Sequence, residues 1–243
     1  MKKQSGFTLI EIMIALLLGL IVLSATIGIY VSTVKGSTDT INSARLNHDL
    51  DSVMSLMVND IRRAGYWGGA IAGANSAANP FISETTNVTN IQLRNLAAPT
   101  TALAAGAAGN CILYTYDADG DGVIDANEYY GFRLNGSTIN MRLTGTTAAP
   151  ASCTNGDWEE NIAGDQITIS ALTFSTAYKC LNVTTAISYN TPCAEVTAAN
   201  LATGAKASES RQLTIVLTGQ LVDDATVTKT LTNTVKVRTD RIL

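Results

Sequence analysis

Apolar residues fill the N-terminal part of the chain almost without interruption. Between residues 7 and 34 the only charged side chain is Glu11, and a short leader with Lys2 and Lys3 precedes this run. Residues 12–34 would form about 34 Å of helix at 1.5 Å per residue, which is enough to cross a bilayer core of about 30 Å. The two lysines predict that the leader stays in the cytoplasm and that the rest of the chain crosses the membrane.

Beyond residue 34 the pattern becomes that of an amphipathic helix. Apolar residues recur at spacings of three and four, at Leu46, Leu50, Val53, Met54, Met57, Ile61 and Ala64. Such a stripe predicts a helix with one face on a protein core and the other face in water. A kink is expected at residues 35–37, because Gly36 weakens a helix interior by roughly 1 kcal/mol. Gly65 is expected to end the helix.

The remaining sequence has the pattern of β-strands separated by loops. Strands are expected at residues 91–93, 111–116, 129–134, 138–143, 166–174, 212–221 and 226–238. Leu213, Ile215 and Leu217 alternate with other residues, as in a half-buried strand, and Asn135-Gly136 predicts a type I′ hairpin turn. We therefore expect an α+β fold in which a long N-terminal helix packs on an antiparallel β-sheet head.

Composition and charge exclude several classes of protein. The 243 residues carry a formal net charge of −4, and the pI near 5.0 argues against a basic nucleic-acid-binding surface. His48 is the only histidine, and no phosphate-binding loop is present. The sequence therefore offers no catalytic constellation, and we expect a protein that is not an enzyme.

The charged residue within the apolar run points to a specific processing motif. A carboxylate costs about 2.5–3.5 kcal/mol at the centre of a bilayer, so Glu11 needs a partner. Residues 6–11, GFTLIE, closely resemble the processing motif of type IV prepilins. The resemblance implies that prepilin peptidase cuts between Gly6 and Phe7, that Phe7 becomes an N-methylated terminus, and that Glu11 pairs with the terminal amine of a neighbouring subunit. A cleavable secretory signal is disfavoured, because its apolar region would span only about 7–15 residues.

A second resemblance concerns the stretch after the long helix. Residues 60–68, DIRRAGYWG, are similar to the corresponding segment of PilW-type minor pilins. The resemblance implies a minor type IV pilin of a priming or tip complex, which supports twitching motility, adhesion or DNA uptake. Its expected partners are other minor pilins, the major pilin, prepilin peptidase, the inner membrane and a tip adhesin. Two alternatives stay open, a type II secretion pseudopilin of the J type and a calcium-dependent adhesin mounted on a pilin helix.

These resemblances divide the chain into four segments. Residues 1–6 would be the cleaved leader, residues 7–34 the transmembrane and filament-core helix, residues 35–65 the amphipathic helix, and residues 66–243 a periplasmic β-rich head. The protein is expected in the inner membrane and, after assembly, in the pilus filament at the cell surface.

An acidic loop in the head has the pattern of a calcium site. Residues 117–128, DADGDGVIDANE, match the loop pattern D-x-D-x-D-G-x-I-D-x-x-E. Carboxylate and carbonyl oxygens suit Ca²⁺ better than a soft metal, and carboxylates this close together would repel one another without a cation. The expected ligands are the side chains of Asp117, Asp119, Asp121, Asp125 and Glu128 and the carbonyl of Val123. Because its flanks are strand-like, we expect a structural Ca²⁺ site outside any helix–loop–helix sensor.

The four cysteines lie in the segment that is predicted to be periplasmic, where disulfides persist. They are Cys111, Cys153, Cys180 and Cys193. Four cysteines allow three connectivities, and the sequence does not choose among them. We favour Cys111–Cys153 with Cys180–Cys193, because the second pair closes a short loop. A zinc site is disfavoured, since no C-x-x-C pair and no nearby histidine is present.

Overall fold

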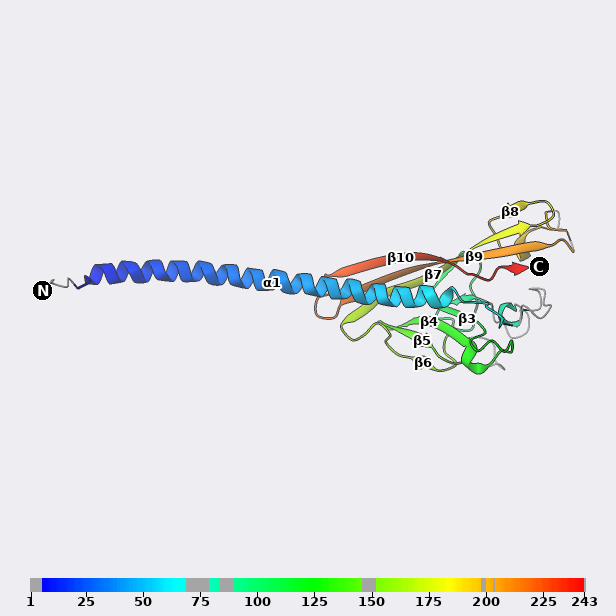
Figure 1. Cartoon of the computed structure of the whole chain (residues 1–243), viewed down its shortest axis with the longest axis horizontal. Helices are drawn as coiled ribbons and strands as arrows, with labels where there is room; N and C mark the ends of the chain where they lie inside the picture. The colour runs from blue at the N-terminus through cyan, green and yellow to red at the C-terminus, as the bar shows by residue number, and fades with distance from the viewer. Residues whose placement is uncertain are drawn as a thin grey trace. The chain divides into compact units, whose positions relative to one another are not determined.

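The computed structural model describes residues 6–68, 79–83, 90–145, 152–197, 200–202 and 204–242 (Figure 1). Most of the predicted leader, residues 1–5, therefore lies outside the described residues. The chain divides into two units, residues 1–45 and residues 46–243, and each is described by itself. The helix α1 (Leu9–Ile61) contributes to both units.

The first unit consists of the apolar part of α1. Its large apolar side chains from Phe7 to Tyr30 are 55–84% exposed, so this is not the core helix of a soluble domain. By length and composition α1 could cross a membrane. The chain remains helical at Gly36, where we expected a kink.

The second unit contains two antiparallel sheets. One sheet has the strand order β1 (Gln92–Arg94), β3 (Cys111–Thr115), β4 (Tyr129–Asn135), β5 (Thr138–Arg142) and β6 (Trp158–Glu159). The other has the order β10 (Thr228–Lys236), β9 (Ala207–Leu221), β7 (Ile167–Asn182) and β2 (Ala108–Gly109). In this second sheet β11 (Arg241–Ile242) pairs with β9, and β8 (Ile187–Tyr189) pairs with β7. Short 3₁₀ helices lie at η3 (Pro80–Ile82), η4 (Ala126–Glu128) and η5 (Cys193–Glu195).

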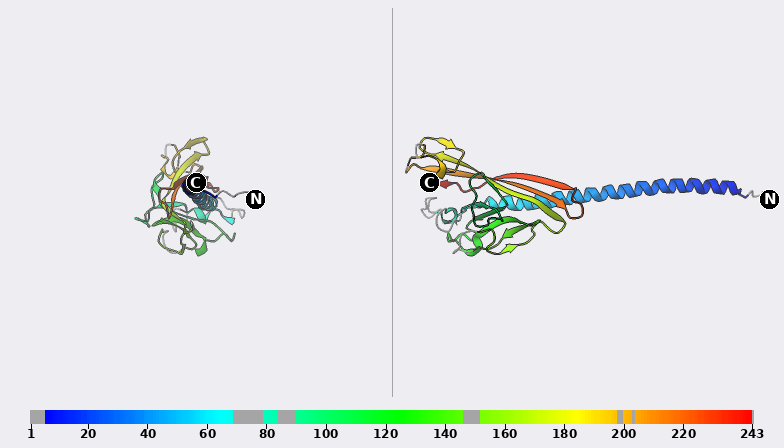
Figure 2. Two further views of the ribbon diagram at one scale, coloured as in Figure 1. Left: turned by 90° about the vertical axis from the view of Figure 1, so that its left-hand side faces the viewer. Right: turned by 180° about the vertical axis from the view of Figure 1, so that it is seen from behind.

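The last turns of α1 pack between the two sheets, as both views in Figure 2 show. All seven residues of the predicted apolar stripe are buried, and they share one core with strands of both sheets. The contact with β9 is close at Gly219, where an added Cβ would lie 2.7 Å from Cδ2 of Leu50. A larger residue there would therefore force the buried side chain of Leu50 to move.

Part of the expected arrangement differs from the structure. The head has two sheets where we expected one, and β7 continues to Asn182 although its expected strand ended at residue 174. Polar residues interrupt the apolar alternation in this extension, and β2, β6, β8 and β11 are too short to show a period. The pairing of Asn135 with Thr138 makes Gly136 and Ser137 the central residues of the hairpin between β4 and β5, and of these two only Gly136 has positive φ. This fits a type II′ turn and not the predicted type I′ turn on Asn135-Gly136.

A buried carboxylate near the end of α1 accepts hydrogen bonds from two tyrosines, one in β3 and one directly after it. Asp60 is 7% exposed and accepts hydrogen bonds from the hydroxyls of Tyr114 and Tyr116. Burial and the nearby Asp60 raise the pKa of both tyrosines, so both hydroxyls remain donors at neutral pH. The guanidinium of Arg63 lies 3.7 Å from Asp60 and 4.2 Å from the ring centre of Tyr116. The helix end is thus fixed to the sheet by polar as well as apolar contacts.

We predict that Asp60→Ala destabilises the head strongly, because it removes the charged acceptor of two buried hydroxyls. Hydrogen bonds to a charged group contribute about 1.5–3 kcal/mol each, so a loss of about 3 kcal/mol or more in the free energy of unfolding is expected. Thermal or denaturant unfolding of the full chain in detergent micelles measures it. The control is Asn59→Ala, at the exposed position directly before Asp60. Equal losses of stability for the two variants would contradict the prediction.

Candidate functional site

Glu11 forms a capping box with Thr8 at the start of α1. The main-chain N–H and the hydroxyl of Thr8 donate to Oε2 of Glu11 at 2.9 and 3.0 Å, and the N–H of Glu11 donates to Oγ1 of Thr8 at 3.3 Å. These bonds satisfy main-chain donors that a helix start leaves unpaired. Our sequence analysis missed this partner, although the spacing T-x-x-E is its signal. The carboxylate of Glu11 is therefore held in the first turn of α1, beside Thr8.

The acidic loop joins β3 to β4 and places its first and last carboxylates side by side. Asp117 and Glu128 are each 1% exposed. One carboxylate oxygen from each of Asp117, Asp119 and Glu128 lies within 4.8 Å of the others, and the same holds for Asp119, Asp121 and Asp125. The structure thus brings the predicted acidic side chains together in two overlapping groups, and this cluster could hold a metal ion.

Asp117 organises the fold of the loop around its own carboxylate. Its Oδ1 accepts the N–H of Gly120 at 2.6 Å, and its Oδ2 accepts the N–H of Gly122 at 3.0 Å. Gly120 and Gly122 have φ of +83° and +81°, a conformation that other residues adopt at a cost. Gly122, which is part of the pattern, and Gly120, which is not, therefore both allow the turns that wrap the loop around Asp117.

The same carboxylate bonds the segment that follows the long helix. Oδ2 of Asp117 accepts the N–H of Gly68 at 2.8 Å, and the N–H of Asp117 donates to the carbonyl of Tyr66 at 3.0 Å. An added Cβ on Gly68 would lie 2.9 Å from the main chain of Gly120. Gly68 is therefore a contact of the loop, which no local pattern in the sequence indicates.

Glu128 closes the loop from the other end. Its Oε1 accepts the N–H of Ala118 at 2.7 Å, and its Oε2 accepts the N–H of Asp125 at 3.0 Å. Burial raises the pKa of Glu128, and the negative charges of Asp117 and Asp119 add to this effect. A bound cation would oppose both causes. Both oxygens of Glu128 and Oδ1 of Asp117 each accept one N–H and keep a second lone pair, so the residues present fit a hard cation.

Two disulfides fix other parts of the head. Cys111 bonds Cys153, and Cys180 bonds Cys193, with sequence separations of 42 and 13. This is the pairing that we favoured among the three connectivities. The imidazole of His48, on an exposed part of α1, lies 3.2 Å from the carboxylate of the neighbouring Asp49.

Comparisons with known protein families agree with the N-terminal motif and extend over the head. Residues 1–27 match the prokaryotic N-terminal methylation motif, and residues 39–237 match the family of prepilin peptidase-dependent protein B. Searches of curated proteins and of solved structures found no match. The motif and the exposed apolar helix fit membrane anchoring and incorporation into a pilus. Because the second match covers well over half of the chain, the protein belongs to the family of prepilin peptidase-dependent protein B and is a type IV pilin-like protein.

Proposed function

We propose that this protein is a minor type IV pilin of the PilW kind, which helps to start pilus assembly within a priming or tip complex. The observation that carries the proposal is the first unit, an apolar helix with no protein cover and one oriented carboxylate at its start. Such a surface requires lipid before assembly and the helices of other pilins afterwards. Other minor pilins and the major pilin are the proposed partners.

The proposed maturation acts on the residues around the start of α1. Prepilin peptidase would cut between Gly6 and Phe7, and Phe7 would then carry the methylated terminal amine. In the filament, Glu11 would pair with the amine of a neighbouring subunit. An ammonium and a carboxylate that enter an apolar environment together each reduce the desolvation cost of the other. The capping box with Thr8 supports this role, because it holds the carboxylate at the helix start.

We further propose that the acidic loop binds Ca²⁺. Its ligands would be the carboxylates of Asp117, Asp119, Asp121, Asp125 and Glu128 and the carbonyl of Val123. The ion would supply positive charge between acidic side chains, two of which are buried. Because Asp117 also bonds Gly68, bound Ca²⁺ would stabilise the junction of the loop with the segment after α1. The role is therefore structural.

The function is tested in a strain that lacks this protein and receives Glu11→Gln. The variant should be cleaved like the wild type, as seen by its mobility on a gel, because the peptidase acts before assembly. The number of surface pili should stay near that of the deletion strain, because a neutral amide cannot pair with the amine. Electron microscopy of sheared pili measures this number.

Two further variants serve as controls for this experiment. Glu159→Gln, on an exposed strand of the head, should restore pili, and Gly6→Val should remain uncleaved. Full restoration of pili by Glu11→Gln would disprove the pairing role. A deletion strain that keeps its pili but fails to secrete proteins would instead indicate a type II secretion pseudopilin.

The calcium proposal predicts a stability difference between Ca²⁺ and chelator. With an affinity of about 10⁻⁴–10⁻³ M, about 10 mM Ca²⁺ would stabilise the full chain by roughly 1.4–2.7 kcal/mol. The melting temperature in micelles should rise by several degrees. Asp119→Asn should reduce this rise without lowering the melting temperature in chelator, since the exposed amide keeps the acceptor for the N–H of Asp121.

Asp165→Asn, an exposed acidic residue outside the loop, is the matched control and should keep the full Ca²⁺ response. The double variant Asp117→Ala with Glu128→Ala should melt at the same temperature with Ca²⁺ and with chelator. A wild-type melting curve that Ca²⁺ does not change would remove the metal site.

A further inference from the structure

One margin of the second sheet is formed by β10, whose outer edge is open (Figure 1). On its inner side β10 pairs with β9 over its whole length, from Thr228 opposite Gln220 to Lys236 opposite Gln212. No described strand pairs with β10 on its outer side. At about 3.3 Å per residue, this open edge is about 30 Å long.

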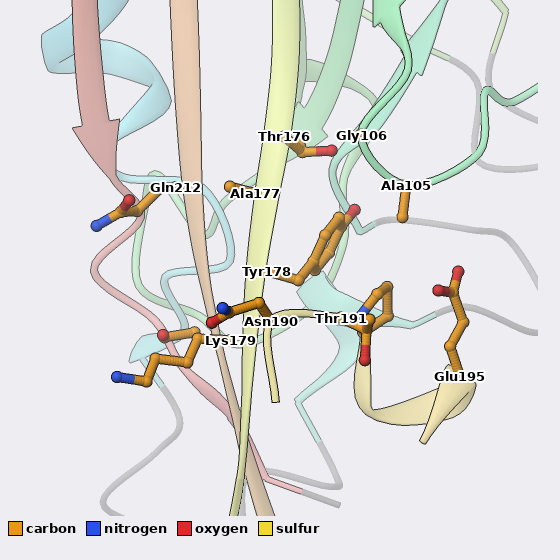
Figure 3. A pocket seen from close by; sticks show the side chains of 12 residues that line it. Ala105, Gly106, Thr176, Ala177, Tyr178, Lys179, Asn190, Thr191, Glu195 and Gln212 are labelled. Carbon is orange, nitrogen blue, oxygen red and sulfur yellow. The ribbon is translucent and has the colours of Figure 1, made fainter. Parts of the chain in front are cut away.

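The opposite margin of the same sheet is filled by the chain itself. There β2 pairs with residues 174–175 of β7, and β8 pairs with residues 180–182. The ring of Tyr178 lies between these two segments, where it lines a cavity of about 440 Å³ together with Ala105 and Thr191 (Figure 3). β10 has no such cover, because seven of its nine residues are exposed.

The ladder between β9 and β10 determines which main-chain groups of β10 face outward. At one end the N–H of Leu221 donates to the carbonyl of Val227 at 3.3 Å, and at the other end the N–H of Val237 donates to the carbonyl of Arg211 at 3.1 Å. Hydrogen-bonded pairs alternate along an antiparallel ladder, so the odd-numbered residues of β10 bond β9. The residues that direct their N–H and C=O groups outward are therefore Thr228, Thr230, Thr232, Thr234 and Lys236. No described residue forms a main-chain hydrogen bond with them on that side.

The outer edge of β10 lacks the features that usually prevent pairing with another chain. Such edges are normally short, bulged, covered or charged. β10 has nine residues, against about five to six for a typical strand, and its register with β9 contains no bulge. Its central residues 230–234 are uncharged, and three of them are threonines, which favour an extended main chain. The edge is therefore long, regular and ready to pair.

The direction of β10 argues against a second copy of this chain as the partner. Leu50 packs close to Gly219, which lies opposite Lys229, and the N–H of Arg238 donates to the carbonyl of Arg62 at 3.3 Å. β10 thus runs in the same direction as the last turns of α1. An antiparallel pair of two β10 strands would set these turns in opposite directions, which two chains anchored in one membrane do not allow.

We propose that the outer edge of β10 binds an extended segment of a different polypeptide, which adds to the sheet as an antiparallel strand. Donor–acceptor sets spaced two residues apart are matched by another extended main chain, the mode called β-augmentation. A sugar or a lipid has no such alternating spacing of donors and acceptors. Antiparallel pairing continues the pattern of this sheet and is slightly more stable per residue than parallel pairing. The binding does not depend on the pilus function proposed above.

The side chains of β10 restrict the partner further. Lys229 is exposed and forms no ion pair with a described residue, whereas Lys236 lies 3.5 Å from Asp240. An acidic partner residue opposite Lys229 would therefore form a favourable cross-strand pair. Hydroxyl side chains suit the centre, as between Thr230 and Thr218 of β9, whose hydroxyls lie 2.9 Å apart. The ligand class is an extended peptide with an uncharged centre and an acidic residue toward its C-terminal end.

The first measurement is amide hydrogen exchange of the full chain in micelles. The amides of Thr230, Thr232 and Thr234 should exchange at least about 10-fold faster than those of Leu231 and Asn233, because only the latter two bond β9. Equal protection of all five amides would show that the chain itself closes the edge and would overturn the proposal.

The second measurement identifies and tests the segment. A photoreactive phenylalanine analogue in place of Asn233 in living cells should form an adduct that maps to one contiguous segment of another protein. The same analogue in place of Glu159, exposed on the other sheet, should not form it. A synthetic copy of the mapped segment should slow exchange at Thr230 and Thr234 at least about 10-fold in the purified chain. A copy with N-methylated amides should not.

Two variants separate binding at the edge from folding. Thr232→Pro removes an N–H that faces outward, and edge strands tolerate such a proline. Exchange at Leu231 and Asn233 should stay slow in this variant, while the peptide should no longer protect Thr230. Lys229→Glu should weaken the binding of the peptide about 2–5-fold, and a peptide with lysine in place of its acidic residue should restore it.

Several outcomes would overturn the proposal. One is that Asn233 gives no adduct beyond that at Glu159, and another is that the adduct maps to a second copy of this chain. Equal protection by the two synthetic peptides would also overturn it, as would undiminished binding to Thr232→Pro. Unchanged affinity in Lys229→Glu would refute the acidic partner residue.

Discussion

Burial of one face of α1 is the constraint on which the head depends. Apolar contact supplies most of the stabilisation, but Asp60 makes the arrangement specific. A buried carboxylate is costly without hydrogen-bond donors, and here the donors are the hydroxyls of Tyr114 and Tyr116. These two residues point to the same side because strand side chains alternate. The helix therefore determines which face β3 turns toward the core.

The position of β3 in turn determines the position of the acidic loop. The N–H of Gly65 donates to the carbonyl of Thr115 at 2.7 Å, and two residues later Asp117 bonds both Tyr66 and Gly68. The end of the helix, the end of the strand and the start of the loop thus form one hydrogen-bonded junction. A cation at Asp117 would stabilise this junction directly, which explains how a site on an exposed loop could affect the stability of the whole head.

Features that depend on neighbours in sequence could be predicted, and features that depend on distant pairing could not. The buried stripe of α1 and the acidic loop each repeat a local pattern, and the structure buries all seven residues of the stripe. The bonds of Asp60 join residues 54 and 56 positions apart, and no local pattern indicates them. The second sheet was missed for a similar reason, because strand pairing is not encoded in the alternation of a single strand. The capping box of Thr8 and Glu11 was local and could have been found.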